Sequence, residues 1–138
     1  MRVLLDTNVV LDVLQAREPF SHHATQLFAR VERGELEGVL CATTLTTIDY
    51  LLGRTMSAQQ AKDAVRSLLD LFEIAAVTRV VLEAALASPM ADFEDAVLAH
   101  AASHAGTDRI ITRNTRDFGQ SPVLAMEPIE FLAQVRDG

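Results

Sequence analysis

The chain has 138 residues, 49% of them hydrophobic, and 12 basic against 19 acidic side chains give it a net charge of −7. This length suffices for a domain with its own core, and no stretch approaches the roughly 18 apolar residues of a membrane span. The acidic balance argues against general nucleic-acid binding. Nucleic acid stays a candidate ligand only if a bound metal and a few local arginines supply positive charge.

The first predicted element is a short strand at Val3 to Leu5, an apolar run typical of strands buried on both faces of a parallel sheet. The run stops at Asp6, and the segment from Thr7 to about Ala16 is predicted to be helical. Asp6 is therefore expected at the carboxyl edge of the sheet, where ligands of open α/β sheets bind. Because Asp and Asn are also favoured helix caps, Asp6 or Asn8 could instead serve only as the cap.

The rest of the chain alternates between short apolar runs and amphipathic segments. Further strands are predicted at residues 38–42, 73–77, 109–112 and 123–125, and further helices at 19–33, 43–52, 58–72, 78–87, 92–105 and after Pro128. This alternation predicts an α/β fold with a central, mostly parallel five-stranded sheet. No repeat, low-complexity tract or linker interrupts it, so we expect a single domain over residues 1–138.

Two features bear on the compartment. Cys41 is the only cysteine, which excludes an internal disulfide, and its apolar surroundings predict a small core residue. The chain opens on a predicted strand and not on the basic and apolar segments of a signal peptide. Both features fit a reducing compartment, so we expect a cytoplasmic protein with no membrane association.

A second group of acids opens the predicted helix 92–105, in the run Asp92-Phe93-Glu94-Asp95. Asp92 and Asp95 are three residues apart, so their side chains lie about 60° apart around the helix and can converge on one site. The same pair resembles a capping box, and acids stabilise helix N-termini in general. A structural role therefore stays open for both.

A third polar group follows the predicted strand 109–112. Thr112, Asn114 and Asp117 offer a hydroxyl, an amide and a carboxylate at the same edge of the sheet, although such residues are also ordinary in loops. Asp49, in the predicted helix 43–52, is a fourth candidate.

Gathering these acids without a cation is unfavourable. Two carboxylates about 4 Å apart repel by roughly 4 kcal/mol at an effective dielectric near 20. Mg²⁺ or Mn²⁺ relieves this repulsion, and such an ion can polarise a phosphodiester and lower the pKa of a bound water. The acids therefore predict metal-dependent phosphodiester hydrolysis.

Three spaced motifs together resemble the PIN domain family, in particular the bacterial VapC-type toxin ribonucleases. They are LLDTNVVLD at residues 4–12, DAVLA at 95–99, and ITRN at 111–114 followed after two residues by DF. The resemblance implies an α/β/α sandwich with strand order 3-2-1-4-5, which brings Asp6 beside the segment from Thr112 to Asn114. It also implies Mg²⁺ or Mn²⁺ as cofactor, RNA as substrate and a cognate antitoxin protein as partner, with a homodimer as one candidate state.

Within this resemblance Asp6 matches the first metal-binding acid and Asp95 the acid of the late helix, while Thr112 and Asn114 match the polar motif. We expect the metal ligands to be Asp6, Asp95 and Asp92, the catalytic set to add Thr112, Asn114 and Asp117, and the substrate contacts to be Asn8, Arg113 and Arg116. The two arginines flank Asn114 and can pair with phosphate, or they can instead pair with acids such as Asp117.

Two positions depart from the family pattern. Many members carry Asp where this chain has Asn114, and many carry Glu where it has Thr47. Asp49 is the nearest acid to Thr47, but two residues on a helix turn a side chain by about 200°. Asp49 is therefore expected to face away from the site.

The resulting prediction is a metal-dependent ribonuclease, the toxin of a toxin–antitoxin pair. The alternative is a degenerate PIN domain that binds RNA or protein without cleavage, which Thr47 and Asn114 keep open. An aspartate-based phosphohydrolase is less favoured, because Asn8 stands where haloacid dehalogenase-like enzymes need a second Asp and the only lysine, Lys62, lies within a predicted helix.

Overall fold

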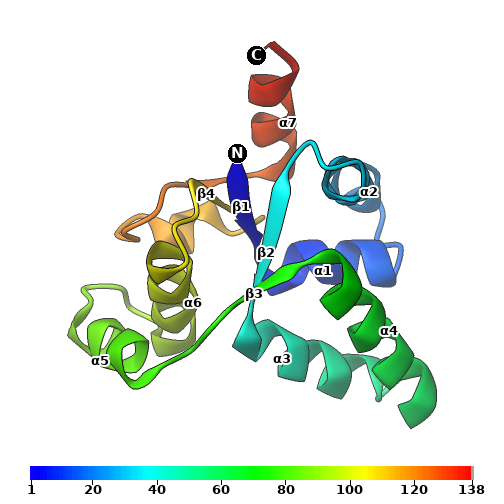
Figure 1. Ribbon diagram of the computed structural model, residues 1–138, viewed down its shortest axis with the longest axis horizontal. Coiled ribbons are helices and arrows are strands. Elements are labelled where there is room, and N and C mark those ends of the chain that lie inside the picture. Colours follow the sequence, from blue (N-terminus) through cyan, green and yellow to red (C-terminus); the bar gives the residue numbers. More distant parts are fainter. Residues whose placement is uncertain (138) are drawn as a thin grey trace.

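A computed structural model describes residues 1–137, which form five strands in one sheet with helices on both faces (Figure 1). The strands are β1 (Arg2–Leu5), β2 (Glu37–Cys41), β3 (Glu73–Ala75), β4 (Arg109–Ile111) and β5 (Ala125–Met126). The helices are α1 (Thr7–Leu14), α2 (Ser21–Glu32), α3 (Ala42–Leu52), α4 (Ala58–Leu71), α5 (Arg79–Ala87), α6 (Phe93–His104), the 3-10 helix η1 (Thr115–Phe118) and α7 (Pro128–Asp137). Within these residues, none of the helices is both long and apolar enough to cross a membrane.

The strand order is β3-β2-β1-β4-β5, and every neighbouring pair is parallel. This confirms the α/β/α architecture and the order that the family resemblance implied. In the sheet β1 lies between β2 and β4, with Leu4 opposite both Val39 and Ile110. The carboxyl ends of β1 and β4 therefore lie side by side. Because β2 and β3 lie on one side of β1 and β4 and β5 on the other, this is the topological switch point of the sheet.

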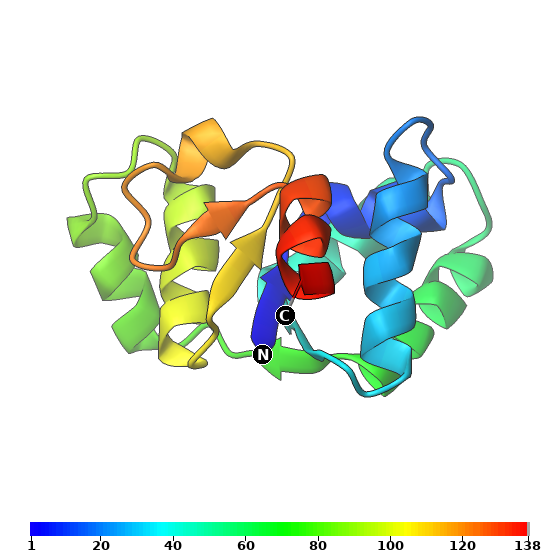
Figure 2. The same cartoon turned by 90° about the horizontal axis from the view of Figure 1, so that it is seen from above.

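The two faces of the sheet support two separate halves of the core. Val3 and Leu5 belong to the half that packs under α1, α2, α3, α4 and α7, whereas Leu4 belongs to the half under α5 and α6 (Figures 1 and 2). All three side chains have no exposed surface. Because successive side chains of a strand point to opposite faces, a strand covered on both sides needs consecutive apolar residues, which explains the run in β1.

Gly38 of β2 has no space for a side chain. A Cβ atom there would lie 2.6 Å from Cδ1 of Phe72 and 2.9 Å from Cγ1 of Val31, both in the packed interior. We expect Gly38→Ala to lower the free energy of unfolding by about 1–3 kcal/mol, since overpacking a core forces neighbours out of place. Urea denaturation of the metal-free protein measures the change.

Gly119→Ala is the matched control for Gly38. A Cβ atom at Gly119 would come no nearer than 3.6 Å to the carbonyl oxygen of Arg116, and its backbone φ of −58° suits any residue. We expect this variant to unfold within about 0.5 kcal/mol of the parent. Equal losses in both variants would contradict the packing argument.

Several element boundaries differ from the sequence-based ones: the predicted helix 19–33 is Ser21–Glu32, and the predicted strands 38–42 and 73–77 are Glu37–Cys41 and Glu73–Ala75. Two further differences have local reasons. The first helix ends at Leu14 and not near Ala16, because Ala16 adopts a left-handed φ of 48°. The last strand begins at Ala125 and not at Val123, because both backbone groups of Val123 bond to the Ser121 hydroxyl, at 2.7 and 3.1 Å. A side chain that satisfies the backbone locally competes with strand pairing.

Candidate active site at the carboxyl edge of the sheet

Asp6 stands directly after β1 and caps α1. Its Oδ1 accepts a hydrogen bond from the Thr7 N–H at 2.7 Å, and its Oδ2 accepts one from the Thr112 hydroxyl at 2.8 Å. The Asp6 N–H in turn donates to the carbonyl of Ile111 at 2.9 Å. Asp6 is thus both the cap of α1 and a neighbour of the loop after β4. A capping role and a role in a site at the sheet edge therefore do not exclude each other.

Asn8 and Thr112 connect this carboxylate to the loop after β4. The Asn8 amide donates over longer distances, 3.4 Å to Asp6 Oδ2 and 3.3 Å to Thr112 Oγ1, and its carbonyl accepts from the Arg113 N–H at 3.3 Å. The fully buried Thr112 hydroxyl also accepts from the Asn114 N–H at 3.0 Å. Both ends of the Asn8 amide therefore bond to the protein itself, whereas the Asn114 residue is exposed.

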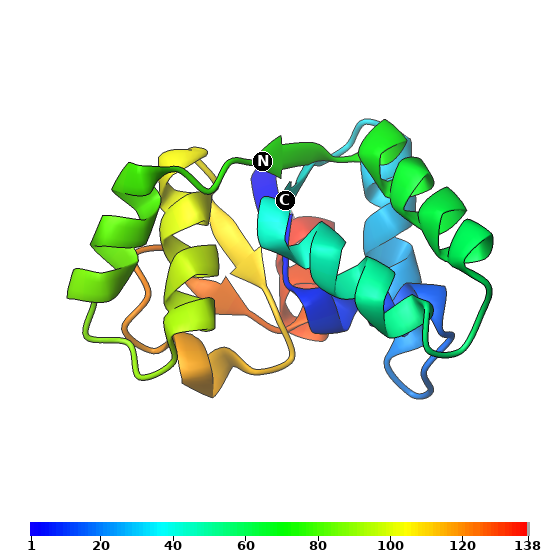
Figure 3. The same ribbon diagram turned by 90° about the horizontal axis from the view of Figure 1, so that it is seen from below.

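The start of α6 brings further acids to this edge. Asp92 is the N-cap of α6 and accepts from the Asp95 N–H at 2.9 Å. Asp117 lies on η1, which packs beside α6 (Figure 3). Asp92, Asp95, Asp117 and Arg116 share the wall of a cavity of about 480 Å³. Asp6 does not line this cavity, so the acids fall into an inner carboxylate, Asp6, and an outer group in the cavity wall.

The charges of the inner and outer acids act on one another. Burial raises the pKa of Asp95 to about 6, and the charges of Asp92, Asp6, Asp117 and Glu94 raise it as well. Burial likewise raises the pKa of Asp6, the hydrogen bonds from Thr112 and Thr7 lower it, and the charges of Glu94 and Asp117 raise it. Neighbouring carboxylates that raise each other's pKa are typical of functional sites.

Glu94 is the acid that sequence reasoning did not select. It is exposed in the first turn of α6, and its charge acts on both Asp6 and Asp95. Glu94 lies in the acidic run from Asp92 to Asp95, but it is not three residues from another acid of that run, as Asp92 and Asp95 are from each other. Position 94 adjoins the site because the whole first turn of α6 lies at the sheet edge.

Asp49 is not brought to this site. Its Oδ1 lies 3.9 Å from Nζ of Lys62 on α4, and it lines a different cavity between α3 and α4. Thr47, at the position where many family members have Glu, donates its hydroxyl to the Thr43 carbonyl at 3.1 Å. The carboxylate that α3 carries therefore faces α4, as the helical turn predicted.

The two arginines of the loop after β4 differ in their surroundings. Arg116 is exposed in the wall of the acidic cavity. Arg113 is instead paired with Asp12 of α1, through Nε to Oδ2 at 2.7 Å. An arginine already bound to a carboxylate is a poorer candidate for a phosphate contact, so the prediction of an RNA contact is favoured for Arg116 and disfavoured for Arg113.

The donor atoms suit a hard divalent cation. No group of three His, Cys, Asp or Glu side chains within the described part of the chain stands ready to hold a metal ion. Mg²⁺, however, is usually held by one or two carboxylates, with water and substrate phosphates as its other ligands. Asp6 and Asp95 supply two carboxylates whose raised pKa values reflect burial and repulsion by nearby carboxylates, which a cation would relieve.

These pKa values predict how pH acts on the metal-free protein. Because the pKa of Asp95 rises from 3.8 to about 6 on folding, the folded state binds more protons between these values, so Asp95 costs stability progressively as pH rises through them. Asp95→Asn removes this cost. We expect the melting temperature of Asp95→Asn minus that of the parent, measured in EDTA, to increase from pH 4 to pH 7. A difference that stays constant over this range would contradict the assigned pKa.

The comparisons with known proteins agree with this fold. A family model described as the PIN domain matches residues 2–116. A comparison with curated proteins found no match.

Several solved structures are similar to this chain. One is a toxin–antitoxin complex from Klebsiella pneumoniae, with a TM-score of 0.69 and 22% sequence identity over 91% of this chain and 97% of that chain. Another is VapBC2 from Rickettsia felis bound to a DNA fragment from their promoter, with a TM-score of 0.68 and 13% identity over 92% of this chain and 98% of that chain. A third is VapC20 from Mycobacterium tuberculosis, a Sarcin-Ricin loop cleaving toxin, with a TM-score of 0.62 and 18% identity over 78% of this chain and 86% of that chain. At these identities the likeness shows the fold, and the family model covers most of the sequence. The chain therefore belongs to the PIN domain family.

Proposed function

We propose that the chain, as one domain over residues 1–138, is a metal-dependent ribonuclease and the toxin of a toxin–antitoxin pair. The observation that carries the proposal is the acidic group at the carboxyl edge of the sheet. Asp95 lies in the cavity wall with Asp92 and Asp117. Burial and the charges of four neighbouring carboxylates raise its pKa to about 6. Such a group is costly without a cation and suits metal-dependent chemistry on a phosphodiester.

In this proposal Asp6 and Asp95 hold the metal ion, with Asp92 as a further carboxylate in the cavity wall. When bound, Mg²⁺ or Mn²⁺ polarises the phosphodiester and lowers the pKa of a water molecule. Thr112 orients Asp6 through its hydrogen bond to Oδ2. Asn114 and Asp117 supply an exposed amide and a carboxylate at the same edge of the sheet, where they would orient the substrate and accept a proton.

The toxin assignment is supported by the structural neighbours. The Klebsiella pneumoniae chain comes from a toxin–antitoxin complex, and VapC20 is a toxin that cleaves the Sarcin-Ricin loop. We therefore propose RNA as the substrate class and a cognate antitoxin as the protein partner.

Incubation of the purified protein with end-labelled single-stranded RNA tests the proposal. We expect cleavage with Mg²⁺ or Mn²⁺ and none in EDTA. RNA that is bound but stays intact with either metal would favour a non-catalytic PIN module, the alternative that Thr47 and Asn114 keep open. Hydrolysis of p-nitrophenyl phosphate without RNA cleavage would favour an aspartate-based phosphohydrolase.

Arg116 is the proposed phosphate contact at the cavity. Each phosphate contact that is removed weakens binding to all RNA sequences and reduces the salt slope by about 1. We expect this result for Arg116→Ala, with Mn²⁺ affinity nearly unchanged, in fluorescence anisotropy titrations from 50 to about 200 mM salt. Arg33→Ala is the control, because Arg33 lies before β2 at the opposite edge of the sheet and pairs with Glu35. Equal salt slopes for the two variants would contradict a phosphate contact at Arg116 and indicate that RNA binds away from the cavity.

A further inference from the structure

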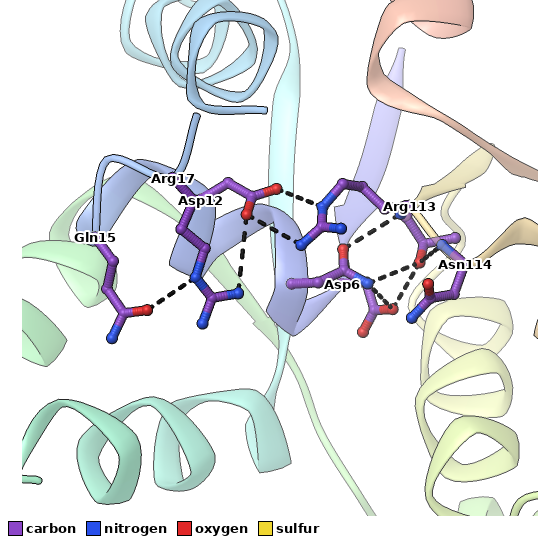
Figure 4. Close-up of polar contacts among 8 residues, drawn as sticks. Asp6, Asp12, Gln15, Arg17, Arg113 and Asn114 are labelled. Carbon is purple, nitrogen blue, oxygen red and sulfur yellow. Dashed lines mark hydrogen bonds and ion pairs between the residues drawn. The ribbon is translucent and has the colours of Figure 1, made fainter. Parts of the chain in front are cut away.

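Asp12 is a buried carboxylate of α1 that lies outside the acidic cavity. Its side chain is 1% exposed, and it accepts two hydrogen bonds from the Arg113 guanidinium, Nε to Oδ2 at 2.7 Å and Nη2 to Oδ1 at 3.2 Å. Nη1 of Arg17 lies 3.9 Å from the same Oδ1. Figure 4 shows Asp12 between the two arginines. A buried ion pair with two parallel bonds fixes the guanidinium in one plane.

A second contact holds the Arg113 side chain in place. Its Cζ atom lies 3.9 Å from the ring centre of Phe20, which approaches it from the connection between α1 and α2. The carboxylate thus holds the edge of the guanidinium and the aromatic ring covers its face. Together they attach the loop after β4 to α1, although Asp12 and Arg113 are 101 residues apart in the chain.

In the chain, Arg113 lies between Thr112, which bonds to Asp6, and Asn114, which bonds to Thr112. Thr112 donates its hydroxyl to Asp6 Oδ2 at 2.8 Å and accepts from the Asn114 N–H at 3.0 Å. The Arg113 backbone N–H itself donates to the side-chain oxygen Oδ1 of Asn8 at 3.3 Å. Because the backbone is continuous through these three loop residues, a fixed Arg113 side chain restricts the positions of both neighbours.

We propose that Asp12 is a positioning residue, which through Arg113 holds the loop so that the Thr112 hydroxyl, itself bonded by the Asn114 N–H, orients the Asp6 carboxylate for metal binding. The inference rests on the proposed function and adds to it a buried residue that touches neither metal nor substrate. Partners that orient a metal ligand commonly contribute 10–100-fold to metal affinity or activity when tested by mutation.

Two variants separate geometry from charge. Asp12→Asn keeps the size of the side chain and one acceptor oxygen, but it no longer forms the charged two-bond pair. Arg113→Lys keeps the positive charge, but a lysine ammonium cannot form the same pair of parallel bonds or stack on Phe20 in the same way. We expect both variants to bind Mn²⁺ about 10–100-fold more weakly than the parent in calorimetric titrations.

The kinetic result distinguishes positioning from a direct role in RNA binding. At saturating Mn²⁺ we expect kcat to fall by about tenfold or more in both variants, while KM for RNA stays within about threefold. Arg66→Gln is the control, because it breaks an exposed pair with Asp63 on α4. It is expected to match the parent in Mn²⁺ affinity, kcat and KM.

Three results would overturn the proposal. Folded Asp12→Asn with parental Mn²⁺ affinity and kcat would make the ion pair merely structural. A raised KM and a reduced salt slope at unchanged Mn²⁺ affinity in Arg113→Gln, which removes the positive charge, would make Arg113 a phosphate contact. A parent that binds no Mn²⁺ would overturn this proposal together with the proposed function. If the parent binds Mn²⁺ but cleaves no RNA, only the proposed function fails, and the Mn²⁺ affinities still decide the role of Asp12.

Discussion

Asp6→Asn is expected to reduce RNA cleavage by about a hundredfold or more while the protein stays folded. The ion that Asp6 is proposed to hold supplies several kcal/mol of charge stabilisation to the reaction, and about 1.4 kcal/mol corresponds to a tenfold change in rate. The fold tolerates the change, because Asn caps a helix as well as Asp does. Since burial raises the pKa of Asp6, its ionised form costs stability at pH 7, and the neutral amide removes that cost.

Two measurements on Asp6→Asn separate function from structure. Initial cleavage rates with saturating Mg²⁺ report the loss of activity, and thermal melts in EDTA report the stability, which we expect to equal or exceed that of the parent. Asp49→Asn is the matched control, because Asp49 is an acid at a different cavity and pairs with the exposed Lys62. A large drop in melting temperature for Asp6→Asn, or cleavage at the parental rate, would contradict the assigned role.

Arg113→Gln is expected to lower the free energy of unfolding by about 3 kcal/mol. Removal of one partner from a buried ion pair leaves the other charge unpaired, at a cost of about 3–5 kcal/mol. The charge left behind here is Asp12, whose side chain is 1% exposed, and of the described part of the chain only Arg17, at 3.9 Å, still forms an ion pair with it. We therefore expect the lower end of the range.

The reverse change, Asp12→Asn, is expected to cost less, about 1 kcal/mol. The charge that it leaves behind is Arg113, whose side chain is 26% exposed and rests on Phe20, so it keeps access to water. Urea denaturation of both variants in EDTA tests this asymmetry, with Arg66→Gln expected within about 0.5 kcal/mol of the parent, because its pair with Asp63 is exposed. A greater loss for Asp12→Asn than for Arg113→Gln would contradict the account.

The sequence predicted those parts of the fold that local pattern determines. The apolar run at Val3 to Leu5 indicated a central strand, and Thr78 indicated the start of α5, where its hydroxyl does accept from the Val81 N–H at 3.3 Å. Asp6 could be assigned to the carboxyl edge of the sheet because it directly follows a strand, and Asp95 because it opens the helix that precedes β4. The strand order itself came from the family resemblance, since local pattern does not determine which strands pair.

Contacts between distant segments could not be read from the sequence. Asp12 lies in an apolar helix and is fully buried, but nothing near it in the chain indicates that its partner is Arg113. For the same reason Arg113 and Arg116 looked equivalent, although one is paired with a buried acid and the other lines the cavity. Glu94 was missed because its effect on Asp6 depends on how α6 meets the sheet.

The central claim is that Asp6 and Asp95 together hold a divalent ion. A crystal of the protein soaked in Mn²⁺ tests it most directly, because the anomalous signal of the ion locates it without reference to activity. The account predicts a peak at the carboxyl edge of β1, with one oxygen of Asp6 and one of Asp95 at about 2.0–2.2 Å. A peak at Asp49 and Lys62 or at another surface acid, with none between Asp6 and Asp95, would contradict it.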